Sequence, residues 1–363
     1  KKSGGGGGQI TLGPKKIPAK KLTTFTRQLA TLLGAGLPLV RALRTLEKQA
    51  KKDLITKEII NNIAADVESG TTFSEALGRE NKSFNKLYVN MVKAGEASGA
   101  MEQVLQRLAE FMEKSERLIR KVKGALTYPV IVLVIALGIT WGLLTFIVPK
   151  FAEMFNDMLE GEPLPGLTLF VMILSNFFQE NFFVVIGGGV VMFIAFILFK
   201  NSKFGSFFLD NVTLRMPPFG SLVTKTSVAR FTRTLGTLLS SGVSILNALE
   251  ITRDTSSNQV IANALQKVHD TVKEGEGMTK PLADAKVFPD MVISMIEVGE
   301  ETGALPEMLG RVADVYEDEV DTAVDALTSL IEPFMIVFLA VIVGGIVISM
   351  FLPLIKMIEN LGG

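Results

Sequence analysis

Two short motifs, each with a glutamate directly after its first glycine, hold the side chains best suited to chemistry in this sequence. They are Gly95-Glu96-Ala97-Ser98-Gly99 and Gly299-Glu300-Glu301-Thr302-Gly303. A carboxylate in a glycine-bounded turn can bind a cation, contact a partner, or accept hydrogen bonds inside the fold. We favour the structural role, in which glycine ends one helix and Ser98 or Thr302 caps the next. The candidate residues are Gly95, Glu96, Gly99, Gly299, Glu300 and Gly303.

Two arginines occur at matching places in the sequence, each well before one of the two motifs. Arg27 and Arg233 lie about one turn from the glycine-broken end of a helix. Because guanidinium groups bind carboxylates in two-pronged geometry, we expect a buried or interfacial ion pair in each stretch. The glutamates of the two motifs are candidate partners, and contact with a ligand is the less favoured reading.

The composition removes most kinds of catalytic centre. The chain has no cysteine and a single histidine, His269, which lies on an expected surface helix. Cysteine-ligated metals, thiol nucleophiles and histidine-cluster metal sites are therefore excluded. The glycine–lysine motif of phosphate-binding loops is also missing. We expect no enzyme activity, no cofactor and no metal site.

Three long apolar stretches indicate a membrane protein. The chain is 48% hydrophobic and 20% charged, with a mean hydropathy of +0.38. Charge-free segments cover residues 124–149, 181–199 and 333–355, and each is long enough for a helix to cross a bilayer. Residues 164–178 are also apolar but short, so we expect an interfacial or re-entrant helix there. Glycines at 187–189 and 344–345 favour close packing between spans, within or between subunits.

The remaining sequence predicts two helical lobes, at residues 22–123 and 200–331. Apolar residues recur at three- and four-residue spacing, with helix breaks expected at Pro38, Asp53, Ser74 and Ser98-Gly99. We therefore expect about six helices in each lobe. Around them we place a flexible, truncated lead-in at 1–21, an outer segment at 150–180, a third span at 332–355 and a short outer tail at 356–363.

The two lobes are copies of one unit. Phe25-Thr26-Arg27 and Phe231-Thr232-Arg233 each begin a similar helix, and Glu113 and Glu317 match further along. Each lobe leads into a span, so the unit is a lobe followed by a span, used twice. The middle span returns the chain across the membrane, which makes the repeats parallel. The sequence thus predicts an all-α membrane protein with two homologous six-helix lobes and three transmembrane helices.

The doubled motif resembles the type II secretion F-domain family over residues 22–357. That family includes the inner-membrane platform proteins of type IV pili and type II secretion systems. The resemblance implies a platform in the bacterial inner membrane that couples a cytoplasmic hexameric assembly ATPase to pilin or pseudopilin movement. It also implies other inner-membrane assembly proteins as partners and a homo-oligomer. The alternative, a transporter or channel subunit, is disfavoured because the spans hold no charged residue.

Charge is divided unevenly between the lobes although the whole chain is neutral. Residues 20–123 carry 19 basic and 12 acidic side chains, and residues 200–325 carry 12 and 18. The neutral total gives no general attraction to nucleic acid. Basic flanks place both lobes in the cytoplasm, but acidic residues before the third span conflict with that orientation. We expect the lobes to attract one another, with the basic side at Lys48, Lys51 and Lys52 and the acidic side at residues 317–321.

Overall fold

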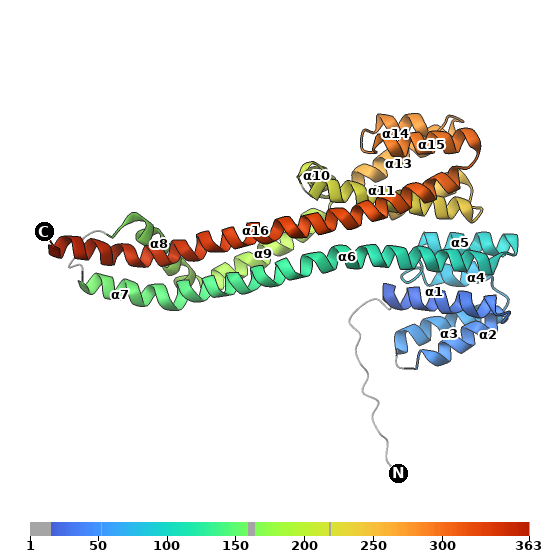
Figure 1. Cartoon of the computed structure of the whole chain (residues 1–363). Helices are drawn as coiled ribbons and strands as arrows, with labels where there is room; N and C mark the ends of the chain where they lie inside the picture. The colour runs from blue at the N-terminus through green and yellow to red at the C-terminus, as the bar shows by residue number, and fades with distance from the viewer. Residues whose placement is uncertain (1–15, 52, 159–163, 218, 363) are drawn as a thin grey trace, which may run out of the picture. The chain divides into compact units, whose positions relative to one another are not determined.

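The computed structural model describes residues 16–51, 53–158, 164–217 and 219–362. Within these ranges the chain is helical and contains no strand (Figure 1). The ranges omit most of the expected lead-in and part of the expected outer segment. The helices group into two compact units, one of residues 1–120 with 220–320 and one of residues 121–219 with 321–363.

The first unit contains two helical lobes, and the first lobe has six helices. Asp53 accepts a hydrogen bond from the Thr56 amide and so caps the third helix, as the sequence predicts. Thr72, rather than Ser74, caps the fourth helix. The core is formed by aromatic and aliphatic side chains such as Phe73, Tyr88 and Leu29. The helices are α1 (Ala19–Gly34), α2 (Leu39–Gln49), α3 (Leu54–Glu68), α4 (Phe73–Arg79), α5 (Lys86–Ser98) and the start of α6 (Met101–Gly142).

The second lobe repeats this order with six helices of its own. Its buried side chains include Phe231, Leu265 and Ile296. The sequence prediction of two six-helix lobes is therefore confirmed. The helices are α11 (Phe219–Ser240), α12 (Ile245–Thr255), α13 (Gln259–Lys273), α14 (Thr279–Asp284), α15 (Asp290–Thr302) and the start of α16 (Leu305–Gly362).

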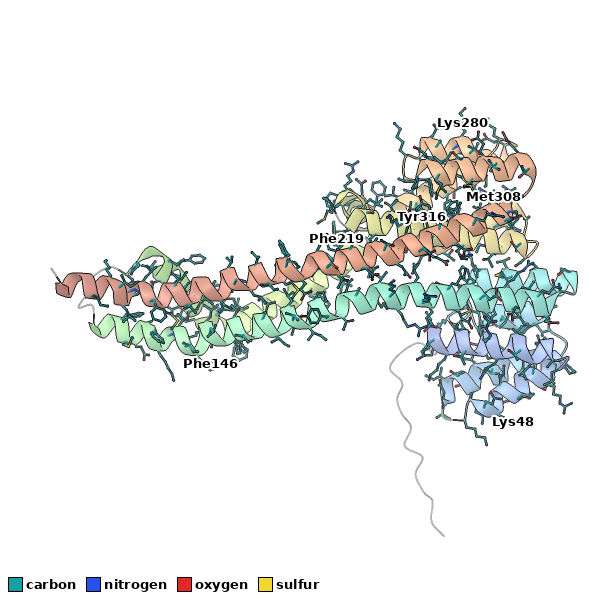
Figure 2. The ribbon with its side chains drawn as sticks, viewed as in Figure 1. Lys48, Phe146, Phe219, Lys280, Met308 and Tyr316 are labelled. Carbon is teal, nitrogen blue, oxygen red and sulfur yellow. The ribbon has the colours of Figure 1, made fainter. Side chains whose placement is uncertain are left out.

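The second unit contains the apolar helices. Three helical stretches are long and apolar enough to cross a membrane, at Met101–Phe155, Phe182–Asn201 and Leu305–Lys356. Their apolar side chains are largely exposed, as at Phe146, which is 61% exposed (Figure 2). Contact with lipid is favourable for such an apolar surface, whereas contact with water is unfavourable. The prediction of three spans is therefore confirmed. The other elements are η1 (Leu143–Ile147), α7 (Val148–Met158), α8 (Gly166–Glu180), α9 (Phe182–Asn201) and α10 (Lys203–Arg215).

The short apolar helix α8 packs within this unit against the first and third spanning stretches. Val171 lies in a cluster with Leu144 and Ile346. The Thr168 hydroxyl donates to the Ser349 carbonyl at 2.5 Å, and the Ser175 hydroxyl donates to the Leu144 carbonyl. These hydrogen bonds satisfy polar groups among apolar neighbours, where an unpaired group is costly.

The glycines of the spans do not bring helices of this chain together. A Cβ atom added at any of residues 187–189 or at Gly344 or Gly345 meets no atom within 4 Å. The expectation of close packing is therefore wrong for contacts within the single chain. Only its other form, packing between subunits, stays a prediction.

Candidate functional site

Each motif glutamate binds the beginning of a helix in its own lobe. Glu96 accepts hydrogen bonds from the backbone amides of Phe73 at 2.5 Å and Ser74 at 3.1 Å, the first residues of α4. Glu300 makes the same contact with α14, through the amides of Met278 at 2.6 Å and Thr279 at 3.2 Å. The first amides of a helix have no partner within it, and the helix dipole favours negative charge there. Each glutamate thus serves as a cap from another helix.

The Thr279 hydroxyl adds a third hydrogen bond to Glu300 at 2.6 Å. Among the described residues of the first lobe, Glu96 accepts hydrogen bonds from the two backbone amides alone. The carboxylate of the second motif is therefore more firmly held than its counterpart in the first.

The motif glycines shape the junction between the last two helices of each lobe. Gly99 and Gly303 adopt positive φ angles of 67° and 71°, which favour glycine and end α5 and α15. Ser98 and Thr302 do not cap the next helix, contrary to expectation. Their hydroxyls donate backwards to helix carbonyls, of Ala94 at 2.8 Å and Val298 at 2.6 Å. The left-handed glycine alone makes the break.

Gly95 and Gly299 allow the helices on either side of the break to approach closely. A Cβ atom at Gly95 would lie 3.1 Å from Val104 Cβ, and one at Gly299 would lie 2.9 Å from the Cα atom of Leu305. Both values are below normal carbon contact distances. Glycine is therefore required by the packing of this corner, most strictly at Gly299.

The two arginines form ion pairs, but with other carboxylates than the motif glutamates. Arg27 binds Glu113 through two hydrogen bonds, of 2.7 and 2.6 Å. Arg233 binds Glu317 at 2.7 Å and Asp314 at 2.5 Å. The expected ion pairs are present, and Glu113 and Glu317 occupy equivalent positions of the repeat.

The pair in the second lobe is the more buried. The Arg233 side chain is 15% exposed and that of Arg27 is 30% exposed. Burial alone would raise the pKa of Asp314, but hydrogen bonds from Lys114 and Arg233 outweigh it and hold that pKa below its ordinary value. The hydrogen bond from Arg27 likewise lowers the pKa of Glu113. Asp314 and Glu113 are therefore charged at neutral pH.

Ion pairs also join the two lobes within the first unit. Lys114 of α6 lies 2.7 Å from Asp314 and 3.6 Å from Glu317, and Lys86 of α5 lies 2.6 Å from Asp254 of α12. The basic first lobe thus contacts the acidic second lobe, as the charge division predicts. The basic residues of this contact, Lys86 and Lys114, differ from those expected. Lys48, one of the expected residues, is exposed on the surface of the first lobe (Figure 2).

Four of the acidic residues before the third span have basic partners, namely Glu317, Glu319, Asp321 and Asp325. In the second unit Lys121 lies 3.1 Å from Asp321 and 3.8 Å from Asp325. In the first unit Glu319 lies 2.7 Å from Lys225. A carboxylate paired with a neighbouring cation contributes little to the net charge of a flank.

No other cluster in the described part of the chain offers ligands for a metal. His269 lies beside Asp270 at 3.1 Å on α13. Among residues 16–51, 53–158, 164–217 and 219–362, no group of three or more histidine, cysteine or acidic side chains could hold an ion. The motif glutamates and glycines thus lie at equivalent places in the two lobes, and Arg27 and Arg233 lie in separate ion pairs.

Comparison with known proteins gives the origin of this doubled arrangement. The sequence pattern of the family described as "Type II secretion system (T2SS), protein F" matches residues 25–149 and, a second time, residues 231–353. The chain belongs to this family. Both matches begin at the phenylalanine of the Phe-Thr-Arg motif and end at a proline near the end of a spanning stretch, so the family unit is one lobe with one span.

Relatives within and beyond pilus assembly cover nearly the whole chain. "Type IV pilus assembly protein PilC" of Thermus thermophilus is 48% identical over 94% of this chain and 84% of its own length. The protein of the same name from Myxococcus xanthus is 44% identical over 96% of this chain and 84% of its own. "Type II secretion system protein F" of Xanthomonas campestris is 38% identical over 98% and 87%.

Proposed function

We propose that this protein is an inner-membrane platform of a type IV pilus or type II secretion system. The family unit, repeated over most of the chain in proteins named for pilus assembly and secretion, carries this proposal. In this role the chain binds a hexameric assembly ATPase and helps pilins or pseudopilins to move between the bilayer and the filament base. It performs no chemistry itself, and it acts as a homo-oligomer with other inner-membrane assembly proteins.

Two continuous helices suit such a role. α6 runs without interruption from the first lobe into the apolar residues of the first span, and α16 does the same from the second lobe. A hydrogen-bonded helix transmits a displacement along its axis better than a loop. The helix interiors contain Pro129, Pro333 and Pro353, each of which removes one backbone hydrogen bond and gives a point of bending.

Binding to the ATPase is the direct test. We expect the purified full chain in detergent to hydrolyse no ATP and to bind the hexameric assembly ATPase of its own system with a dissociation constant on the order of micromolar. Size-exclusion chromatography with light scattering measures the complex, and an unrelated hexameric ATPase serves as the control. Equal binding to both hexamers, or ATP turnover that remains after every trace of the motor is removed, contradicts the proposal.

The proposed topology places both lobes in the cytoplasm, with the segment between the first two spans outside. We expect a reporter fused after Glu180 to be external and one fused after Thr255 to be internal. The basic residues on the lobe side of the first two spans support this orientation. Paired alkaline phosphatase and fluorescent protein fusions measure it, and an external Thr255 contradicts both the topology and the parallel repeat.

A further inference from the structure

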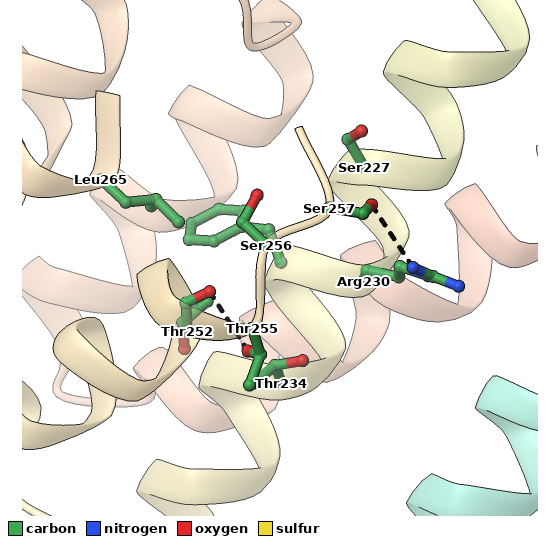
Figure 3. Close-up of a pocket in the computed structure, with 9 residues that line it drawn as sticks. Ser227, Arg230, Thr234, Thr252, Thr255, Ser256, Ser257 and Leu265 are labelled. Atoms are coloured by element: carbon green, nitrogen blue, oxygen red, sulfur yellow. Dashed lines mark hydrogen bonds between the residues drawn. The ribbon is translucent and has the colours of Figure 1, made fainter. Parts of the chain in front are cut away.

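Both lobes contain a pocket at the same place in the repeat. The first pocket lies between α1, α2 and the start of α3, and the second lies between α11, α12 and the start of α13 (Figure 3). Eight of the nine residues that line the second pocket occupy positions equivalent to residues lining the first. The nine are Ser227, Arg230, Phe231, Thr234, Thr252, Thr255, Ser256, Ser257 and Leu265.

The first pocket neutralises its own charge. Lys21 lies 2.5 Å from Asp53, which also accepts a hydrogen bond of 2.7 Å from the Thr56 hydroxyl. The hydrogen bond from Lys21 lowers the pKa of Asp53 to about 2, so the carboxylate stays ionised at neutral pH. This cation therefore has a partner within the lobe.

The second pocket has exchanged these groups. Ser227 stands where the first lobe has Lys21, and Asn258 stands where it has Asp53. A new cation, Arg230, has replaced Thr24, and none of the nine lining residues is acidic. The repeat has thus kept a positive charge in the pocket and lost the negative one.

Arg230 is left without a counter-ion among the described residues. Its Nη1 atom donates one long hydrogen bond, of 3.4 Å, to the Ser257 hydroxyl (Figure 3). Its Nε atom is buried and has no acceptor in the described part of the chain. Burial lowers the pKa of Arg230, but an arginine keeps its proton in proteins. The half-buried guanidinium has no counter-ion and its buried Nε donor has no acceptor, and both are costly, so this arrangement favours an anion.

Hydroxyl groups around Arg230 supply further donors. The hydroxyls of Thr252 and Thr255 donate to helix carbonyls, and that of Ser256 donates to the Asn258 carbonyl. Those of Ser227 and Thr234 make no hydrogen bond among the described residues, and Ser257 only accepts from Arg230. The cavity volume is about 20 Å³, which is room for about one water-sized group, so a larger anion can place only part of itself inside and no nucleoside can enter.

We propose that the second-lobe pocket binds a single phosphate group at its mouth, held by Arg230, by the hydroxyl of Ser257 and by one of the hydroxyls of Ser227 and Thr234. A tetrahedral oxyanion fits a guanidinium and hydroxyl donors that come from different elements, α11 and the linker before α13. The group is free phosphate or the terminal phosphate of a larger molecule that stays outside the cavity. This site is independent of the proposed function, because no step of it involves the ATPase or a pilin.

Calorimetric titration of the full chain in detergent with inorganic phosphate at constant ionic strength tests the site. We expect one site on the wild-type chain, and at least about tenfold weaker binding for Arg230→Gln, since the charged donor is lost. The matched control is Lys21→Gln in the first pocket, which should leave phosphate affinity within about twofold.

A second variant works without removing the arginine. Asn258→Asp places the carboxylate of the first lobe at the equivalent position of the second, and Asp53 caps the equivalent helix α3 through such a carboxylate. We expect it to weaken phosphate binding at least about tenfold by pairing with Arg230. If both variants bind phosphate as tightly as the wild type, the proposal is wrong.

A lipid arm distinguishes the source of the phosphate. Chain reconstituted in nanodiscs of neutral lipid is compared with chain in nanodiscs carrying phosphatidic acid, each with and without free phosphate, with hydrogen exchange of residues 252–262 as the readout. Protection by free phosphate that Arg230→Gln abolishes supports a soluble ligand, and the same loss with phosphatidic acid alone supports a headgroup. Protection by neither source, at up to about 10 mM phosphate, overturns the site.

Discussion

Glu300→Ala is expected to lower the free energy of opening of α14 by about 3 kcal/mol, because it removes the acceptor of three hydrogen bonds. The amides of Met278 and Thr279 are then left at a helix end without a partner. Hydrogen exchange of residues 278–283 in the full chain measures the effect, and a loss of this size corresponds to a roughly hundredfold fall in protection.

The neighbouring glutamate provides the control. Glu301 is exposed, so Glu301→Ala should change the same protection by less than about 0.5 kcal/mol. Glu300→Gln keeps an acceptor and loses the charge, and should fall between the two. Glu96→Ala is expected to expose the start of α4 in the same way, with a smaller effect because two hydrogen bonds are lost. Unchanged protection in Glu300→Ala, with assembly abolished, would make the residue a partner contact.

The repeat made the important residues visible in the sequence, but their partners needed the structure. The contact of Glu96 with Phe73 spans 23 residues and crosses from one helix to another, so no local pattern reports it. The partner of Arg27 was open to inference, because Glu113 and Glu317 lie 204 residues apart, close to the 206 residues that separate the two arginines. Two residues of opposite charge that are duplicated together are candidates for one contact.

For the spans, the composition of the sequence predicted where each one lies but not where its helix begins. Apolar content located the three spans, since lipid imposes a minimum length on each. The same reasoning placed a boundary at residues 123–124, whereas α6 continues through it from Met101 to Gly142. Hydropathy changes at that point while the helical hydrogen bonds continue, because Gly124 alone does not end a helix. A lobe and its span therefore share one helix.

The second pocket lay outside the sequence predictions for a related reason. The exchange of Thr24 for Arg230 and of Asp53 for Asn258 is visible when the repeats are aligned. Its meaning depends on the packing of three helices, which places Thr24 and Asp53 at one cavity of the first lobe and Arg230 at the equivalent cavity of the second. Differences between repeats were thus as informative as the identities, once the fold gave each position a place.

Gly299→Ala is expected to destabilise the second lobe by about 2 kcal/mol, and Gly299→Leu by about 4 kcal/mol or more. The added Cβ would lie 2.9 Å from the Leu305 Cα atom and 3.3 Å from Met308 Cβ, so the backbone of α16 must move. Gly95→Ala should cost less, about 1 kcal/mol, because its nearest neighbour is a side-chain atom of Val104 at 3.1 Å.

The absence of cysteine from the chain allows a sensitive measurement of this effect. Ala313 is fully buried, and Ala313→Cys introduces one thiol whose labelling rate reports opening of the second lobe. A loss of about 2 kcal/mol should raise that rate roughly 30-fold. Gly310→Ala is the matched control in α16, since its Cβ meets no atom within 4 Å. Alanine has the better helix propensity, so Gly310→Ala should stabilise the lobe by up to about 1 kcal/mol and thereby slow labelling. If Gly299→Ala also slowed labelling, α15 and α16 would not need the close approach that only glycine permits.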